Sequence, residues 1–256
     1  MFNREEIAEL WKDPILRYSN ALDGLFHAAV VIAEGERDAH FYNAAIDYVQ
    51  SVATPERPAD NLMFLGTSGK TNIARIATRL HKLGVRTVSC PDLDILDNET
   101  VLRPLVAAHR GNWDELADDY KRATAEFRNV PNAPAKADVR KAIIELIDET
   151  SDQTLTESLA TAITKAVKIP STRWSALKDG FVAALKNDRA AATRLLDKLD
   201  ELGIVTVKVG VLENFLTTAT APKGPEFLPV SFAEKAHTQQ PAVDHANRLL
   251  KAAGIN

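Results

Sequence analysis

The sequence predicts an α/β fold in which a parallel sheet is flanked by helices. Three short, mostly apolar segments, 28-AAVVIA-33, 61-NLMFL-65 and 85-VRTVSC-90, alternate with longer segments of helical periodicity. Continuous apolar runs of this length are typical of strands that are buried on both faces of a parallel sheet. Their alternation with helices along the chain indicates the parallel α/β class.

The segments between these strands have the periodicity of amphipathic helices. The first lies at 34–50, and the second, at 72–83, ends at Gly84, a residue suited to a helix C-cap. A further amphipathic helix is predicted at the N-terminus, over residues 4–24. The apolar residues of the 34–50 segment recur at helical spacing, at Ala39, Tyr42, Ala45, Ile46 and Val49.

Helical periodicity dominates from residue 100 to residue 202, and 203-GIVTVKVG-210 then predicts a fourth buried strand. This strand can still join the same sheet, because a long insertion in a surface connection costs little loop-closure entropy. The expected organisation is an N-terminal helical segment (1–27), the first part of the α/β core (28–111), a helical insertion (112–202), and the last strand with C-terminal helices (203–256).

The composition is that of an ordinary globular protein, with 45% apolar and 26% charged residues and a net charge of −4. No apolar run approaches the roughly 20 residues of a membrane span, and the polar N-terminus is not a secretory signal. The single cysteine, Cys90, excludes an internal disulfide and a multi-cysteine metal site. We therefore expect a cytoplasmic protein without a membrane partner, and the net charge does not exclude local basic patches for nucleic acid.

Acidic residues follow three of the four predicted strands. Glu34 comes directly after the first strand, and Asp38 lies one helical turn further along the same side. Asp92 and Asp94 follow the third strand, and Glu213 follows the fourth. Because ligands bind outside the carboxyl ends of the strands in open parallel sheets, these carboxylates are expected to meet at one edge.

Carboxylates that are brought together repel each other and raise each other's pKa values, so divalent cations are expected among them. Mg²⁺ and Mn²⁺ prefer oxygen ligands, and two such ions roughly 4 Å apart would stabilise the attacking and leaving oxygens of a phosphodiester displacement. No Cys/His set with zinc spacing is present. A single acid at the start of a helix is ordinary, since it complements the helix dipole, and only the combination at three strand ends is specific.

The stretch 66-GTSGKTN-72 looks like the phosphate-binding loop of an ATPase but fails its spacing. A Walker A loop needs a glycine five positions before Gly69, and that position is Phe64. The prediction is instead a tight turn that carries Ser68 and Lys70 beside the acidic edge. Its backbone N–H groups and Lys70 could hold a nucleic-acid phosphate; the alternative is a turn with a solvated lysine.

Together, 34-EGERDAHFY-42, 66-GTSGKTNIARIATRL-80 and 92-DLDIL-96 resemble a Toprim domain, the catalytic fold of topoisomerases, primases and several nucleases. They are most similar to the Toprim part of the OLD (overcoming lysogenization defect) nucleases. In that family, a Gly-x-Leu-Glu strand end and a Lys-Gly turn follow the helical insertion, and 210-GVLENF-215 and 222-PKGPEF-227 match them. The resemblance covers most of the chain, although the insertion matches in character more than in sequence.

The resemblance implies a Toprim core with two divalent ions, Mg²⁺ or Mn²⁺. It gives Glu34 a catalytic role, and Lys223 matches the family's catalytic lysine, which stabilises charge on the phosphate in the transition state. Without the resemblance, Lys223 would be interpreted as a surface lysine in a Pro-Gly loop. Thr67 stands where the family has glycine, so Lys70 is a weaker match. The implied metal ligands are Glu34, Asp38, Asp92, Asp94 and Glu213.

The function implied by the resemblance is a metal-dependent endonuclease or nickase that cleaves DNA, with a role in phage defence. Two alternatives stay open: an RNA-cleaving Toprim effector that an ATPase partner activates, and a non-catalytic metal-binding interaction module. OLD proteins carry an ATPase domain before the Toprim part, whereas the first strand here begins near residue 28. We expect the ATPase upstream in a longer protein or on a separate chain, unless the nuclease acts alone. The oligomeric state also stays open.

Overall fold

A computed structural model of the chain describes residues 12, 20–52, 61–128, 135–149, 154–167, 174, 176–179, 182–217 and 222–255. The chain divides into two compact units: Met1–Ala125 together with Trp174–Asn256, and Glu126–Arg173. Most of the predicted 4–24 helix lies outside the described residues, and its described end, Asn20–Phe26 (η1), is a 3₁₀ helix. The first unit contains a sheet and the second is helical.

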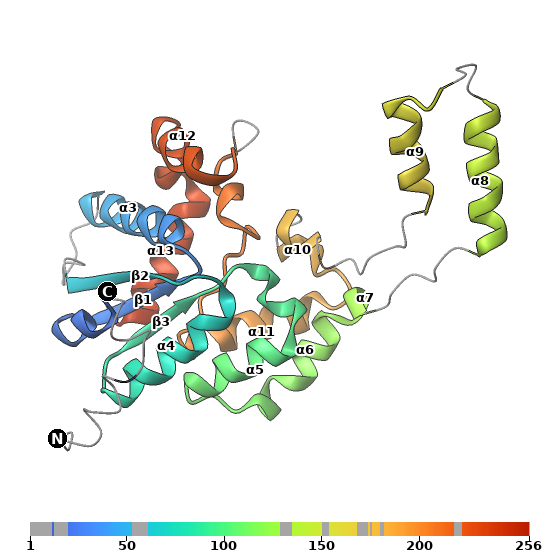
Figure 1. The fold of residues 1–256 in the computed structure, drawn as a ribbon. Helices are drawn as coiled ribbons and strands as arrows, with labels where there is room; N and C mark the ends of the chain where they lie inside the picture. Colours follow the sequence, from blue (N-terminus) through green and yellow to red (C-terminus); the bar gives the residue numbers. More distant parts are fainter. Residues whose placement is uncertain are drawn as a thin grey trace. The chain divides into compact units, whose positions relative to one another are not determined.

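A three-stranded parallel sheet lies at the centre of the first unit. It consists of β1 (Ala29–Ala33), β2 (Leu62–Gly66) and β3 (Thr87–Cys90), in the order β2-β1-β3 (Figure 1). Every residue of β1 and β3 is buried, as the continuous apolar runs indicate. The predicted α/β class, a parallel sheet flanked by helices, is therefore confirmed at this level.

The predicted fourth strand is only partly formed. Ile204 and Val207 make isolated parallel bridges to Ser89 and Asp92, beside β3. The N–H groups of Val205 and Val207 donate to the carbonyls of Ser89 (2.8 Å) and Pro91 (3.0 Å). Because Pro91 has no N–H to return, the ladder is interrupted where the sequence predicted a continuous strand. The segment still runs along the sheet and carries the following residues to its carboxyl edge.

Helices cover both faces of the sheet (Figure 1). On one face α3 (Glu36–Val52) packs against α13 (Gln240–Ala253), and on the other α4 (Lys70–Lys82) packs against α5 (Glu99–Ala108). The core beneath α3 contains the ring of Phe41, whose centroid lies 5.1 Å from that of Phe215. This apolar layer fixes the start of α3 against the sheet edge. The short elements are η3 (Leu93–Asp97), η4 (Trp113–Glu115), α7 (Ala125–Arg128), α10 (Ala176–Asp179), η6 (Val182–Ala184), η7 (Leu212–Phe215), η8 (Gly224–Glu226), α12 (Phe227–Ala233) and η9 (Ala236–Thr238).

Two helices that the sequence assigned to the 112–202 insertion pack within the first unit. These are α6 (Ala117–Ala123) and α11 (Arg189–Glu201). The buried carboxylate of Asp119 on α6 lies 2.7 Å from Arg194 and 3.1 Å from Lys198, both on α11. The second compact unit, Glu126–Arg173, therefore covers only part of the predicted insertion at 112–202. The helices α6 and α11 belong to the first unit, where they pack against each other.

Among its described residues, the second unit contains two longer helices, α8 (Lys136–Asp148) and α9 (Glu157–Val167), which pack against each other. Neither helix has a buried residue among those described, and Ile144 and Ile147 of α8 are about half exposed. In the part of the chain that the structure describes, no helix combines the length and apolar character that crossing a membrane requires.

Candidate metal centre

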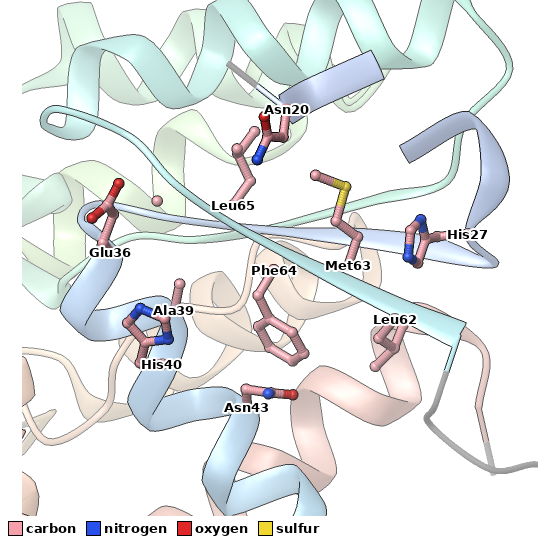
Figure 2. Close-up of a pocket in the computed structure, with 11 residues that line it drawn as sticks. Asn20, His27, Glu36, Ala39, His40, Asn43, Leu62, Met63, Phe64 and Leu65 are labelled. Atoms are coloured by element: carbon pink, nitrogen blue, oxygen red, sulfur yellow. The ribbon is translucent and has the colours of Figure 1, made fainter. Parts of the chain in front are cut away.

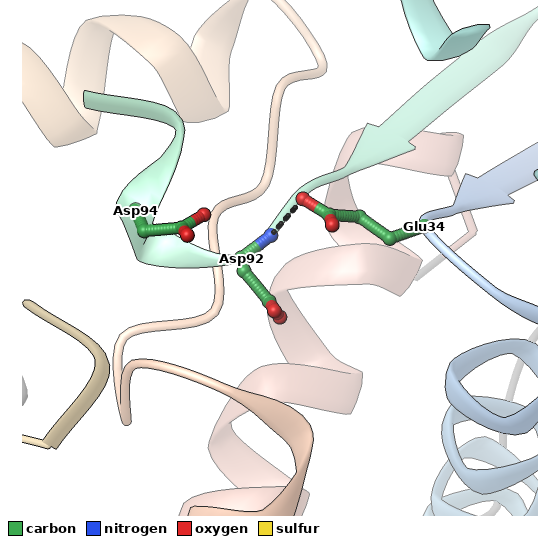
Figure 3. A group of neighbouring side chains, drawn as sticks. All are labelled: Glu34, Asp92 and Asp94. Carbon is green, nitrogen blue, oxygen red and sulfur yellow. Dashed lines mark hydrogen bonds between the residues drawn. The ribbon is translucent and has the colours of Figure 1, made fainter. Parts of the chain in front are cut away.

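Three carboxylates meet at the carboxyl ends of β1 and β3. Glu34 directly follows β1, Asp92 lies two residues after β3, and Asp94 lies in η3. One oxygen from each lies within 4.8 Å of the other two, and Figure 3 shows the three side chains together. The register pairs Ala33 with Cys90, the last residues of β1 and β3. Because the two strands end side by side, the residues that follow them lie at the same edge of the sheet. We call Glu34, Asp92 and Asp94 the acidic cluster.

The acidic cluster is electrostatically unfavourable when it holds no cation. The Asp92 N–H donates to Glu34 Oε1 over 3.2 Å, the bond drawn in Figure 3. Even so, burial and the charge of Asp94 raise the pKa of Glu34 to about 7. Burial and the charge of Glu34 raise the pKa of Asp92 to about 9. Both groups therefore hold protons at pH values where an ordinary carboxyl is ionised.

Asp92 also carries an oxygen that lacks a partner. Its Oδ1 atom is buried, and none of the described residues gives it a hydrogen bond. A buried polar atom without a partner costs free energy that a bound ion or water would offset. The donor set consists of carboxylate oxygens, which are the ligands that Mg²⁺ and Mn²⁺ prefer. The residues present therefore fit a hard divalent cation.

The other two predicted metal ligands, Asp38 and Glu213, lie beside the acidic cluster and not within it. Asp38 is in the first turn of α3, and its charge contributes to the raised pKa of Asp92. Burial raises the pKa of Asp38 itself, and the charge of Glu213 adds to the effect. Arg37 Nη1 lies 3.9 Å from Glu213 Oε1. The charges of all five predicted acids are thus felt at one edge, with three of them in direct proximity.

The turn after β2 supports the end of β1. The N–H groups of Thr67 and Gly69 donate to the carbonyls of Ala33 (3.0 Å) and Glu34 (3.1 Å). These two N–H groups are therefore not available to a phosphate, which corrects that part of the prediction for this turn. Ser68 is exposed, and its carbonyl accepts a bond from the Asn72 side chain.

Lys70 is bound to acids and is not a solvated lysine. It is the first residue of α4, so the helix begins two residues before the predicted start. Its Nζ atom lies 3.2 Å from Asp94 Oδ1 and 3.2 Å from Asp97 Oδ1. Lys70 thus places a positive charge against the acidic cluster and compensates part of its repulsion.

Lys223 is exposed and directly precedes η8. None of the described residues forms an ion pair or a hydrogen bond with its side chain. Its loop is nevertheless connected to the acidic edge, because Arg37 Nη1 donates to Gly224 O over 2.6 Å and also faces Glu213. Arg37 therefore connects the loop that carries Lys223 to the predicted ligand Glu213.

Lys178 contacts the acidic cluster although no sequence pattern predicts it. Its Nζ atom lies 3.1 Å from Asp94 Oδ2. Lys178 belongs to α10, within the stretch that the sequence assigned to the helical insertion, far along the chain from every predicted strand. No spacing or motif marks it, so only the fold brings it to Asp94.

A separate groove of about 710 Å³ runs along β2. Figure 2 shows it between the strand, Asn20 of η1, His27 and the first turns of α3, with Glu36 and His40 among the side chains that line it. The acidic cluster does not line this groove. The groove therefore contributes nothing to the metal centre.

Comparison of the chain with protein-family models, with curated proteins and with solved structures found no significant match. The side chains at the sheet edge are thus the observations that bear on function. They combine three clustered carboxylates with two lysine ammonium groups that are bound to one of them, Asp94.

Proposed function

We propose that the chain is a Toprim-like, divalent-metal-dependent nuclease that hydrolyses DNA phosphodiester bonds. The observation that carries the proposal is the acidic cluster, whose three carboxylates approach within 4.8 Å at the edge of a parallel sheet. Such an arrangement is unfavourable without positive charge and becomes favourable around a cation. The edge is also where open α/β sheets bind their ligands.

The oxygen ligands and the unpartnered Asp92 Oδ1 favour Mg²⁺ or Mn²⁺ as the resident ion. When bound, two such ions would supply activation of water and stabilisation of the leaving oxygen. The acidic cluster would hold the first ion, while Asp38 and Glu213 would contribute to the second. Mg²⁺ typically takes only one or two carboxylates, with water and phosphate completing its shell.

The protein's own groups would position the reactants. The Asp92 N–H holds the Glu34 carboxylate, which limits the number of orientations available to it. Lys70, fixed by Asp97, would keep positive charge beside Asp94. Lys223, exposed on its loop, would approach a bound phosphodiester and stabilise charge that develops on the phosphate. A role in phage defence, with an ATPase domain or partner chain, belongs to the same proposal.

Cleavage assays on supercoiled plasmid DNA and on tRNA test this function. We expect nicked or linear plasmid with Mg²⁺ or Mn²⁺ and none with EDTA. Asp92→Asn and Glu34→Gln should lose at least the roughly 10- to 100-fold that removal of an outer-shell metal partner costs. Asp114→Asn is the matched control, because Asp114 is an exposed acid in η4, outside the predicted ligand set.

The outcomes separate the candidates. Cleavage of tRNA without cleavage of plasmid would favour the RNA-cleaving effector. Tight Mn²⁺ binding without cleavage of either substrate would favour a non-catalytic metal-binding module. If Asp92→Asn cut plasmid as well as the parent chain does, the acidic cluster would not be the active site.

A further inference from the structure

Both carboxylate oxygens of Asp94 are bound by lysines. Lys70 Nζ lies 3.2 Å from Oδ1, and Lys178 Nζ lies 3.1 Å from Oδ2. A cation that coordinates Asp94 needs at least one of these oxygens. An ammonium group and a metal ion therefore compete for the same carboxylate, and the two lysines differ in how readily they can leave it.

Lys70 is the more firmly held of the two lysines. Besides Asp94 Oδ1, its Nζ atom contacts the Asp94 carbonyl oxygen and Asp97 Oδ1, each at 3.2 Å, and its side chain is 24% exposed. Lys178 has Asp94 as its sole ion-pair partner among the described residues, and its side chain is 54% exposed. Lys178 is therefore the one that a cation would displace.

The backbone beneath Lys178 is anchored even though its side chain is exposed. Leu177 is fully buried, and the Asn214 side-chain amide donates to both the Lys178 carbonyl and the Val209 carbonyl. Gly210 has a φ of 103°, and a Cβ atom there would lie 2.5 Å from the Lys178 carbonyl oxygen. The backbone of Lys178 is thus held in place, while its half-exposed side chain can move beside the acidic cluster.

We propose that Lys178 occupies Asp94 while the metal site is empty and binds the scissile phosphate of the nucleic acid once a cation has taken Asp94. The inference rests on the proposed function. A lysine ammonium is a compact charge at the end of a flexible side chain. With its backbone anchored, such a side chain can move from Asp94 to a phosphate oxygen close by. Lys178 would thereby stabilise the acidic cluster without a metal ion, and would help to bind nucleic acid once the metal ion is bound.

Two measurements test the two halves of this proposal. Calorimetric titration with Mn²⁺, without nucleic acid, compares the parent chain with Lys178→Met and with Lys121→Met, a control at an exposed lysine of α6. Because the lysine of this ion pair is about half exposed and the pair is therefore weak, we expect Lys178→Met to bind Mn²⁺ roughly two- to fivefold more tightly than the parent. Lys121→Met should leave the affinity unchanged.

The second measurement follows DNA binding in Ca²⁺, by fluorescence anisotropy over a series of salt concentrations. Loss of one phosphate contact should reduce the slope of log affinity against log salt by about 0.9. We expect this reduction in Lys178→Met, and we expect Lys178→Arg and Lys121→Met to retain the parent slope. An unchanged Mn²⁺ affinity or an unchanged slope in Lys178→Met would overturn the inference. If the parent chain bound neither Mn²⁺ nor DNA, the proposed function would fail as well.

Discussion

Replacing Asp92 by asparagine is expected to remove a pH-dependent loss of stability from the metal-free protein. Burial and the charge of Glu34 raise the pKa of Asp92 to about 9, from an ordinary value of 3.8 that applies to the unfolded chain. Between these two values the folded chain binds a proton that the unfolded chain lacks. The free energy of unfolding therefore falls as the pH rises through this window.

The size of the effect follows from the same linkage. Each pH unit in the window costs about 1.4 kcal/mol per carboxyl group, so one group loses about 3 kcal/mol between pH 6 and pH 8. For a chain of this size, that corresponds to a fall in Tm of about 6–12 °C. Asparagine has nearly the shape of the protonated acid and does not titrate. Glu34, whose pKa burial and Asp94 raise to about 7, contributes a smaller slope of the same sign.

The assay is thermal unfolding followed by circular dichroism in EDTA at pH 6, 7 and 8. It compares the parent chain with Asp92→Asn and with the exposed control Asp114→Asn. Across this range Asp92→Asn should lose less stability than the parent and the control, by about 3 kcal/mol between pH 6 and pH 8. Parallel pH profiles for the parent and Asp92→Asn would refute the description of Asp92 as a buried, protonated acid.

Three further outcomes follow from the structure. Mn²⁺ affinity should rise by up to about tenfold per pH unit for each proton displaced from the acidic cluster, and calorimetry showing no pH dependence would contradict the raised pKa values. Gly66→Ala would place a Cβ atom 2.4 Å from the backbone nitrogen of Glu36. We expect it to lose about 1–3 kcal/mol in urea unfolding, and an unchanged midpoint would show that the turn relaxes freely. Asn214→Ala should lower the free energy of unfolding by about 0.5–1.5 kcal/mol. It should also weaken the ion pair of Lys178 with Asp94 and so raise the affinity for Mn²⁺. An Mn²⁺ affinity equal to that of the parent would argue that Asn214 does not anchor Lys178.

The sequence predicted the sheet and three members of the site because both depend on local pattern. The residues of β1 and β3 are apolar or small and are buried throughout, so their continuous runs identify them as strands. Glu34 and Asp92 come together because parallel strands that end level deliver their next residues to one edge. The position of these two acids after predicted strands was sufficient to predict that they meet at one edge of the sheet.

The remaining features depend on contacts between residues far apart in the chain. Lys178 reaches Asp94 across 84 sequence positions, from a helix that local pattern assigned to an insertion. The helices α6 and α11, which lie in the predicted insertion, belong to the first unit and are joined by the ion pair of Asp119 with Arg194, a contact that periodicity does not reveal. The ladder to the fourth strand is interrupted at Pro91, which has no N–H to donate. The proline is evident in the sequence, but its effect depends on which strand it pairs with, and the sequence does not show that pairing.

The most direct test of the metal centre is an anomalous difference map from a crystal of the protein soaked in Mn²⁺. The acidic cluster predicts a peak that touches oxygens of Glu34, Asp92 and Asp94 at roughly 2.0–2.6 Å, the range for hard divalent cations. A second peak beside Asp38 and Glu213 is expected from a two-ion mechanism. Mn²⁺ bound elsewhere in the crystal with no peak at the acidic cluster would contradict the assignment.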